Sequence, residues 1–482
     1  MSKEIRSGIA ADIFWYSFGV LVPMTLGFIK TPIFTRYFTP EEYGYLSIVS
    51  STFNYLIIFT FSWLASCLWR YYNHYKNKES LGLLYSNILF LYLLSSTVLI
   101  LVSSAWVYLS GNGTTVTLVV LLCIQTILSQ MIELHMVVIR LEGQSFKYNI
   151  ITACISVSSF ILLLFLTFVL RMRIGAVIGS TVVINALVLA YIIFSPAYKG
   201  NIFISGISYS RIKEFVHYGI PAIASELSLI VLTSSDRYVI ALFKDMEAVG
   251  IYNQVYSISE MSIAAMIGVY TNSITPVLFR ELESNLKGYS STLYRYTNIY
   301  ILYLLPVVVY SSLFSKQIAL ILLGESFREG SGIMPYIMFT AFIYGITDFI
   351  QDILRFSNKL KILVKGFVIA TIVNIALNFM LVPFFSYQVA SVTTLAAYII
   401  LYIYYYYKDS TRYFHNNRNL KTVFPYILIL MAQVFLDQVL RKLARIEIGV
   451  LLTIAEGFLF SAIYYGVLMR KQVLAVLKRF KC

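Results

Sequence analysis

The chain alternates between long apolar runs and short polar segments over its whole length. Each run holds about 20 residues or more, the helical length needed to cross a hydrocarbon core of about 30 Å. The ten-residue alternation of an outer-membrane barrel is missing, so the pattern predicts α-helical spans. We predict fourteen, near residues 9–29, 44–67, 82–109, 115–139, 149–170, 174–194, 215–235, 250–275, 297–323, 332–354, 361–384, 387–407, 422–440 and 448–468.

Composition agrees with this pattern. Of the 482 residues, 59% are hydrophobic and only 12% are charged, against about a quarter in soluble domains. No segment between the runs is long enough to fold as a separate domain. The sequence therefore predicts an all-α polytopic membrane protein whose function lies within the membrane.

The net charge of +14 indicates how the chain is oriented in the membrane. Lys and Arg lie in short segments between spans and at the C-terminus, not on a soluble basic face, so nucleic acid is not an expected partner. If the N-terminus is cytoplasmic, 26 of the 37 basic residues face the cytoplasm, which favours both termini inside. The first run is too long for a signal-peptide core, and we expect it to remain as the first span.

One hairpin occurs twice in outline. Each copy has a proline inside an apolar run, an arginine near the end of the run, and a glutamate just before a glycine that opens the next run. The matched residues are Pro23 and Pro221, Arg36 and Arg237, Glu42 and Glu247, and Gly44 and Gly250. The spacing predicts an internal repeat with a period of roughly 200 residues.

Each copy of the repeat holds six spans. Because six is even, both halves enter the membrane in the same sense, and a pseudo-two-fold axis along the membrane normal would relate them. We expect a six-helix lobe in 1–205, a second in 206–410, two further helices with a basic cytoplasmic tail in 411–482, and a cavity between the lobes.

Carboxylates inside spans need a reason, because each costs about 2.5–3.5 kcal/mol on insertion scales. Glu226 lies near the middle of the seventh span and shares a helical stripe with Thr233 and Arg237. A functional interpretation is a wet pathway in which Glu226 binds a coupling cation or sugar hydroxyls. A structural interpretation is a paired or protonated contact between helices.

The eighth span has a similar polar stripe, formed by Asn253, Ser257 and Glu260, and the same two interpretations apply to Glu260. Asp12 belongs to a stripe in the first span. Its place near the cytoplasmic end is explained equally well by a solvated helix start.

Three arginines lie at the ends of predicted spans. Arg36 and Arg237 end corresponding spans, and Arg70 follows the second span. A guanidinium is always charged and can bind a diphosphate through a bidentate fork. The alternative is an interfacial anchor beside the neighbouring tyrosines.

Motifs for bond chemistry are missing. The sequence has no glycine-rich phosphate loop, no nucleophile elbow and no HExxH, and its four cysteines lack metal-ligand spacing. A membrane glycosyltransferase or polymerase would need a sizeable outer loop with catalytic residues, and none is present. We expect a transporter with no cofactor or metal, driven by an ion gradient, by the membrane potential or by downstream consumption of its product. H+ and Na+ are the candidate coupling ions.

Five segments resemble one family. They are TRYFTPEEYGYLSI, WLASCLWRYYN, RLEGQSFKY, the pair YGIPAIASELSLIVLTSSDRYVIALF and EAVGIYNQVYSI, and LLGESFREG. In them the chain is similar to the polysaccharide-transport (Wzx-type) lipid-linked oligosaccharide flippases. These belong to the superfamily that also contains MATE exporters and lipid II flippases.

The resemblance implies a bacterial cell membrane, a central cationic cavity and ion-coupled alternating access. The substrate would be an undecaprenyl-diphosphate-linked oligosaccharide moved to the outer leaflet for capsule, exopolysaccharide or O-antigen synthesis. Glycosyltransferases and a polymerase would be partners. A MATE-type small-molecule exporter and a lipid II flippase remain alternatives on the same architecture.

The candidates fall into two groups. Arg36, Arg70, Arg237, Asn253 and Ser257 are the candidate substrate-binding residues, and Asp12, Glu226 and Glu260 are the candidate ion-coupling residues. The resemblance gives Arg70 and Arg237 to the substrate and Glu226 to coupling. The middle of the first two spans contains no arginine.

Overall fold

The described part of the computed structural model consists of helices and the short turns that connect them, and it contains no strand. It describes residues 19, 21–78, 80–194, 206–284, 289–356, 359–408, 430–431, 433, 435, 457 and 459–464. Nine helices in this part are long and apolar enough to span a membrane. The prediction of an all-α polytopic membrane protein is confirmed. The count of fourteen stays a prediction, because most of 9–29, 422–440 and 448–468 lies outside the described residues.

The chain divides into two compact units, Met1–Asn253 and Gln254–Cys482. The division falls inside helix α9 (Met246–Ser284). It therefore comes later than the boundary at 205/206 expected from the repeat, and the two six-helix lobes remain a prediction. Each unit is described by itself below.

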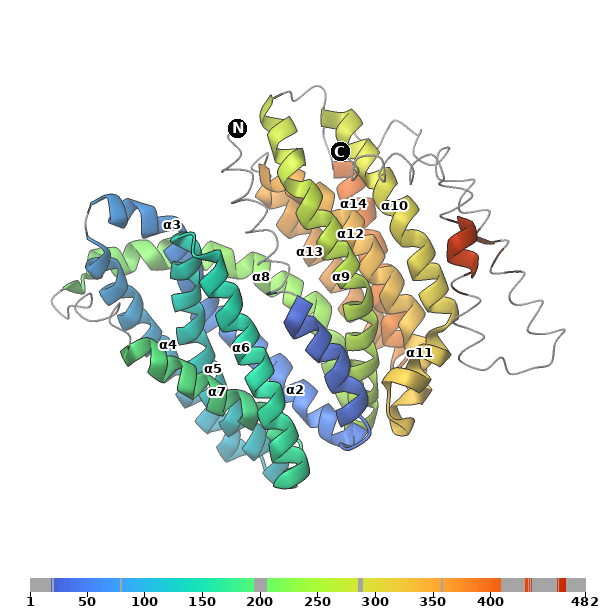
Figure 1. Ribbon diagram of the computed structural model, residues 1–482, viewed down its shortest axis with the longest axis horizontal. Coiled ribbons are helices and arrows are strands. Elements are labelled where there is room, and N and C mark those ends of the chain that lie inside the picture. Colours follow the sequence, from blue (N-terminus) through green and yellow to red (C-terminus); the bar gives the residue numbers. More distant parts are fainter. Residues whose placement is uncertain are drawn as a thin grey trace. The chain divides into compact units, whose positions relative to one another are not determined.

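The first unit is a bundle in which α2 packs on α5, α5 on α7, and α3 on α8. Figure 1 labels these helices. Before α2 lies a helix over Leu21–Phe34. The others are α2 (Pro40–Ile57), the π-turn η1 (Ile58–Ser62), α3 (Trp63–Asn77), α4 (Leu81–Leu109), α5 (Gly113–Leu141), α6 (Ser145–Leu164), the π-turn η2 (Phe165–Val169), α7 (Gly175–Phe194), α8 (Tyr209–Phe243) and the first turns of α9.

The starts of α2 and α9 are capped in the same way. Thr39 Oγ1 accepts a hydrogen bond from Glu42 N at 3.3 Å, and Glu42 Oε2 accepts from Thr39 N at 3.0 Å, which completes a capping box. At the start of α9, Asp245 Oδ1 accepts from Ala248 N at 2.7 Å. Both side chains satisfy a backbone donor that a helix start leaves unpaired.

The two capped starts cross in direct backbone contact. A Cβ added to Gly44 would overlap the carbonyl of Met246, and a Cβ added to Gly250 would overlap the carbonyl of Pro40. The contact is reciprocal, since the partners of each glycine occupy matching places in the two hairpins. Two equivalent hairpins that meet about a local two-fold axis would make such a contact.

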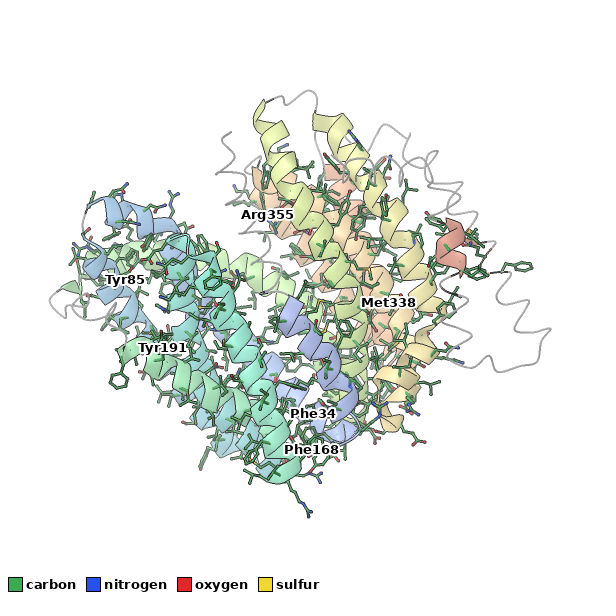
Figure 2. The ribbon with its side chains drawn as sticks, in the orientation of Figure 1. Phe34, Tyr85, Phe168, Tyr191, Met338 and Arg355 are labelled. Carbon is green, nitrogen blue, oxygen red and sulfur yellow. The ribbon has the colours of Figure 1, made fainter. Side chains whose placement is uncertain are left out.

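The end of helix Leu21–Phe34 is fixed by aromatic packing. The Phe34 and Phe168 rings stack with centroids 6.2 Å apart, and Figure 2 shows them side by side. Tyr37 packs edge-on against Phe168 and donates from Oη to the carbonyl of Thr167 at 3.2 Å. The π-turn η2 thus anchors the first helix against α6.

The second unit contains the remainder of α9 and the helices that follow it. These are α10 (Tyr289–Leu313), α11 (Ser315–Leu322), the 3-10 segment η5 (Glu325–Ile333), α12 (Met334–Phe356), α13 (Leu360–Leu381) and α14 (Val389–Lys408). The predicted span 297–323 is wrong as one helix, because the chain breaks at Phe314 between α10 and α11.

Buried polar side chains join α13 to α14. Asn378 Nδ2 donates to Asn374 Oδ1 at 3.2 Å, and Asn374 Nδ2 donates to Thr394 Oγ1 at 3.3 Å. Thr393 Oγ1 donates to Asn378 Oδ1 at 2.5 Å. All four residues are buried, and their groups satisfy one another where water is excluded.

We predict that Gly44→Ala destabilises the protein by about 1–3 kcal/mol, because the new methyl forces the crossing backbones apart. Thermal unfolding of the purified protein in detergent measures this loss. Gly179→Ala in α7 is the matched control, since its added Cβ meets no atom within 4 Å. A Gly44→Ala variant as stable as Gly179→Ala would contradict the prediction.

Candidate functional site

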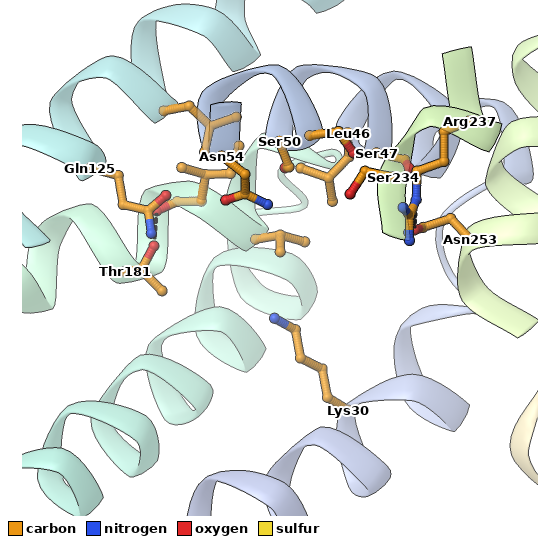
Figure 3. Close-up of a pocket in the computed structure, with 14 residues that line it drawn as sticks. Lys30, Leu46, Ser47, Ser50, Asn54, Gln125, Thr181, Ser234, Arg237 and Asn253 are labelled. Atoms are coloured by element: carbon orange, nitrogen blue, oxygen red, sulfur yellow. Dashed lines mark hydrogen bonds between the residues drawn. The ribbon is translucent and has the colours of Figure 1, made fainter. Parts of the chain in front are cut away.

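A polar cavity of about 400 Å³ lies inside the first unit. Helix Leu21–Phe34, α2, α5, α7, α8 and the first turns of α9 contribute to its wall (Figure 3). Its lining residues are Lys30, Leu46, Ser47, Ser50, Ser51, Asn54, Leu122, Gln125, Val177, Ile178, Thr181, Ser234, Arg237 and Asn253.

The cavity is positively charged. Lys30 and Arg237 line it, and none of its fourteen lining residues is a carboxylate. In Figure 3 the Lys30 amine extends toward the cavity from the first helix, while Arg237 comes from α8. Eight further lining side chains carry a hydroxyl or an amide. The wall therefore combines two cations with many neutral hydrogen-bonding groups.

Arg237 is held from two sides. Its Nε donates to Asn253 Oδ1 at 2.7 Å, and its Nη1 donates to the carbonyl of Thr233 at 2.7 Å, one turn earlier in α8. Only 8% of the residue is exposed. Thr233 and Arg237, which share a stripe in the sequence, lie one turn apart in α8, and the contact is made by the backbone carbonyl of Thr233.

Asp236 lies beside Arg237 but not in the cavity lining. Its carboxylate is fully buried, with Oδ1 3.8 Å from Arg237 Nη1. Asp236 Oδ2 accepts a hydrogen bond from the Tyr252 hydroxyl at 2.5 Å, and Oδ1 accepts from the Arg237 backbone N at 2.9 Å. Tyr252 and Asn253 are neighbours in α9, so one turn of α9 supports both members of the pair.

The adjacent Tyr238 ties α8 to α2, because its hydroxyl lies 2.7 Å from Thr52 Oγ1. Three consecutive residues of α8 therefore have three separate partners. Asp236 contacts α9, Arg237 reaches the cavity, and Tyr238 contacts α2. The Asp-Arg-Tyr sequence fixes the rotation of α8 within the first unit.

One face of α2 supplies the neutral part of the wall. Ser47, Ser50, Ser51 and Asn54 recur at the i, i+3, i+4 and i+7 spacing of one helical face. Ser47 Oγ is buried and has no hydrogen-bond partner among the described residues. A buried hydroxyl without a partner is costly unless water or a ligand reaches it.

Chemically, this arrangement suits an anion that carries hydroxyl groups. A guanidinium and an ammonium together match a group with two or more negative charges, such as a diphosphate. The amides and hydroxyls can pair with neutral polar groups beside that charge. The fourteen described lining residues include no Asp, Glu, His or Cys.

Two of the five candidate substrate-binding residues, Arg237 and Asn253, line this cavity and contact each other. Arg36 is exposed just after the first helix, and its Nη1 donates to the carbonyl of Pro32 at 2.5 Å. Arg70 is exposed in α3. Both lie outside the lining, and their roles stay predictions. Ser257 is half-buried and belongs to the second unit.

The candidate coupling residues do not line this cavity either. Glu226 is half-buried in α8, and the rise of a helix puts it about 16 Å along the axis from Arg237. Glu260 is exposed in α9, in the second unit. Asp12 lies outside the described residues. In the same second unit, Asp352 Oδ1 pairs with Arg355 Nη1 at 3.2 Å.

Sequence reasoning missed Lys30 and the polar face of α2. A signal for that face existed, since four polar residues at helical spacing interrupt an otherwise apolar run. Lys30 gave less signal, because a lysine at the end of a span more often reaches for the interface. Gln125 in α5 and Thr181 in α7 gave no signal, because the sequence does not distinguish a cavity residue from an ordinary polar contact between helices.

Comparison with solved structures identifies the fold. The lipid II flippase MurJ in an inward closed conformation matches with a TM-score of 0.72 and 15% identity, over 95% of this chain and 100% of that chain. An inward-facing multidrug resistance MATE transporter of the MOP superfamily matches with a TM-score of 0.58 and 16% identity, over 81% and 94%. The Vibrio cholerae MATE transporter VcmN in its bent form matches with 0.53 and 14%, over 86% and 97%.

The protein thus has the fold of the membrane transporters of the MOP superfamily. A family model described as "Polysaccharide biosynthesis protein" matches residues 9–282, more than half of the chain. The chain belongs to this polysaccharide biosynthesis family, which confirms the resemblance drawn from its segments. No curated protein matches it.

We predict that the purified protein binds inorganic pyrophosphate and that Arg237→Gln weakens this binding at least tenfold, since a charge-assisted bond to a desolvated anion is lost. Isothermal calorimetry in detergent measures the affinity. Lys244→Gln is the matched control, because Lys244 is an exposed cation just after the same helix. Equal losses in both variants would show that the cavity is not the anion site.

Proposed function

We propose that this protein is a flippase for undecaprenyl-diphosphate-linked oligosaccharides, which it moves from the cytoplasmic to the outer leaflet of a bacterial cell membrane. The products would supply capsule, exopolysaccharide or O-antigen synthesis. Both termini would lie in the cytoplasm, and glycosyltransferases and a polymerase would act before and after the transport step.

The cavity of the first unit carries this proposal. It places Lys30 and Arg237 beside eight hydroxyl- or amide-bearing side chains in a chain built of membrane-spanning helices. A diphosphate that joins a lipid to a sugar is complementary to this wall, because its negative charge lies next to hydroxyl groups. The family match supports the same class of substrate.

The transport problem is one of desolvation. A polyprenyl tail is stable in hydrocarbon, but each unpaired polar group of the headgroup costs several kcal/mol there. A polar cavity replaces the water bound to the diphosphate and the first sugar with fixed donors and acceptors. No bond has to be made or broken, so a binding cavity that opens to either side in turn suffices.

The charge of the described cavity lining favours an anionic substrate over a small cation. A cationic drug would need a carboxylate or an aromatic cage, whereas two cations and no carboxylate line this wall. A lipid II flippase would also handle a polyprenyl diphosphate, so the cavity alone does not separate the two lipid substrates. The polysaccharide family match favours the oligosaccharide.

Energy would come from a gradient of H+ or Na+. Glu226, Glu260 and Asp12 are the proposed coupling residues, because carboxylates in membrane helices are rare and commonly mark ion pathways. Glu226 has no hydrogen bond or ion pair with any other described residue and is half-buried.

Deletion of the gene should leave lipid-linked repeat units facing the cytoplasm and remove the surface polysaccharide. The wild-type chain should restore the polymer, and Arg237→Gln should restore less than about a tenth of it, since the diphosphate loses its main cation. Polymer is quantified on whole cells, with membrane levels of each variant matched by immunoblot. Normal surface polysaccharide in the deletion strain would end the proposal.

Glu226→Gln should slow ion-driven transport at least tenfold while leaving the protein level and pyrophosphate affinity unchanged, because Glu226 lies far from the cavity cations. Proteoliposomes with an imposed H+ or Na+ gradient, loaded with a labelled lipid-linked oligosaccharide, measure the rate. Asn54→Ala tests the opposite pattern, with weaker binding and intact gradient dependence. Wild-type transport by Glu226→Gln would leave Glu226 a structural residue.

A further inference from the structure

We propose that Asp236 is an internal counter-ion of Arg237 that weakens the hold of the cavity on a bound diphosphate, so that the diphosphate can leave. The inference deepens the proposed function and rests on it. It assigns a role in substrate release to a residue outside the cavity lining.

The geometry separates the charge of Asp236 from the positioning of Arg237. Two neutral acceptors already orient the guanidinium, with donor–acceptor distances of 2.7 Å each to Asn253 Oδ1 and the Thr233 carbonyl. The distance from Arg237 Nη1 to Asp236 Oδ1 is 3.8 Å, too long for a hydrogen bond. Asp236 therefore acts on the Arg237 guanidinium through its charge.

Asp236 is itself fixed in place. The Tyr252 hydroxyl donates to one carboxylate oxygen and the Arg237 backbone N to the other, and the side chain is 1% exposed. Both donors partly offset the negative charge of the carboxylate. A buried charge held in this way cannot turn toward the cavity and block it, but its field still reaches the cavity.

That field opposes anion binding. Unit charges several ångströms apart in a partly buried site interact by more than thermal energy. A diphosphate at Arg237 is attracted by the guanidinium and repelled by the carboxylate behind it. A transport site must bind its substrate strongly enough to admit it and weakly enough to release it. Two cations without a counter-ion in a membrane cavity would bind the diphosphate too tightly for it to leave.

Glu226 cannot act as the counter-ion of Arg237, because it lies about 16 Å from Arg237 along α8. No carboxylate lines the cavity, and Asp236 is the carboxylate within 4 Å of Arg237 among the described residues. The adjacent position in the sequence also ensures that carboxylate and guanidinium move together when α8 moves.

The test is Asp236→Asn, which removes the charge and nearly keeps the shape. Its amide oxygen can still accept from the Arg237 backbone N, and its NH2 group would donate to the Tyr252 hydroxyl, which then accepts. We expect about tenfold tighter binding of inorganic pyrophosphate and of farnesyl diphosphate, and slower dissociation, because the repulsion is gone. Calorimetry gives the affinity and stopped-flow displacement gives the off-rate. Unchanged or weaker binding would overturn the proposal.

The matched control is Glu142→Gln. Glu142 Oε1 also accepts from a tyrosine hydroxyl, that of Tyr72, at 3.2 Å. It caps the end of α5, about 25 Å along the helix from the cavity residue Gln125. Wild-type affinity is expected, and tightening equal to that of Asp236→Asn would also overturn the proposal.

Tyr252→Phe gives a second measurement of opposite sign. Without the hydroxyl, less of the carboxylate charge is offset, so pyrophosphate should bind about threefold more weakly. This variant decides the matter alone if Asp236→Asn does not fold, and unchanged or tighter binding would count against the proposal. A wild-type protein that binds no diphosphate at all would instead refute the proposed function.

Discussion

The structure of the first unit depends on one constraint, the presence of the buried arginine Arg237 in helix α8 of a membrane protein. A lone guanidinium there would cost several kcal/mol, so every donor needs an acceptor or water. Arg237 meets this demand with its own preceding turn, with an amide of α9 and with a polar cavity. Because these partners come from different elements, the arginine also fixes how α8 and the start of α9 pack. Its neighbours add two contacts that position α8, because Asp236 accepts a hydrogen bond from Tyr252 of α9 and Tyr238 bonds to Thr52 of α2.

The close crossing of α2 and α9 serves this constraint. Asn253 of α9 and the polar face of α2 line the same cavity, and Gly44 and Gly250 allow the starts of these two helices to approach by removing two side chains from the contact. The caps Thr39 and Asp245 then let both helices begin where their polar faces are needed. The apolar packing around Phe34 and Phe168 holds the first helix, and with it Lys30, at the same end.

Much of the fold follows from hydropathy alone, since membrane length and apolar composition set where a helix must lie. The predicted spans 82–109 and 174–194 match α4 (Leu81–Leu109) and α7 (Gly175–Phe194) closely. The break at Phe314 was missed, because both flanking segments are apolar and no proline or glycine marks it. The site was only half predicted. A helical stripe shows which residues share a face, as for Thr233 and Arg237, but it does not show which helix that face meets.

The same limit explains why the sequence singles out Glu226 and not Asp236. Glu226 and Asp236 are two acidic residues in one helix, and the sequence singles out Glu226 because it lies deeper in the apolar run. In the structure Asp236 is the one beside the cavity cation, although a carboxylate next to an arginine in sequence resembles an ordinary span end. A charge at position i+1 on a helix points about 100° away from its neighbour, so direct pairing is not expected. Tyr252 makes the pairing possible by holding the carboxylate from the α9 side, and the cavity thereby keeps its positive charge on the wall and its negative charge behind it.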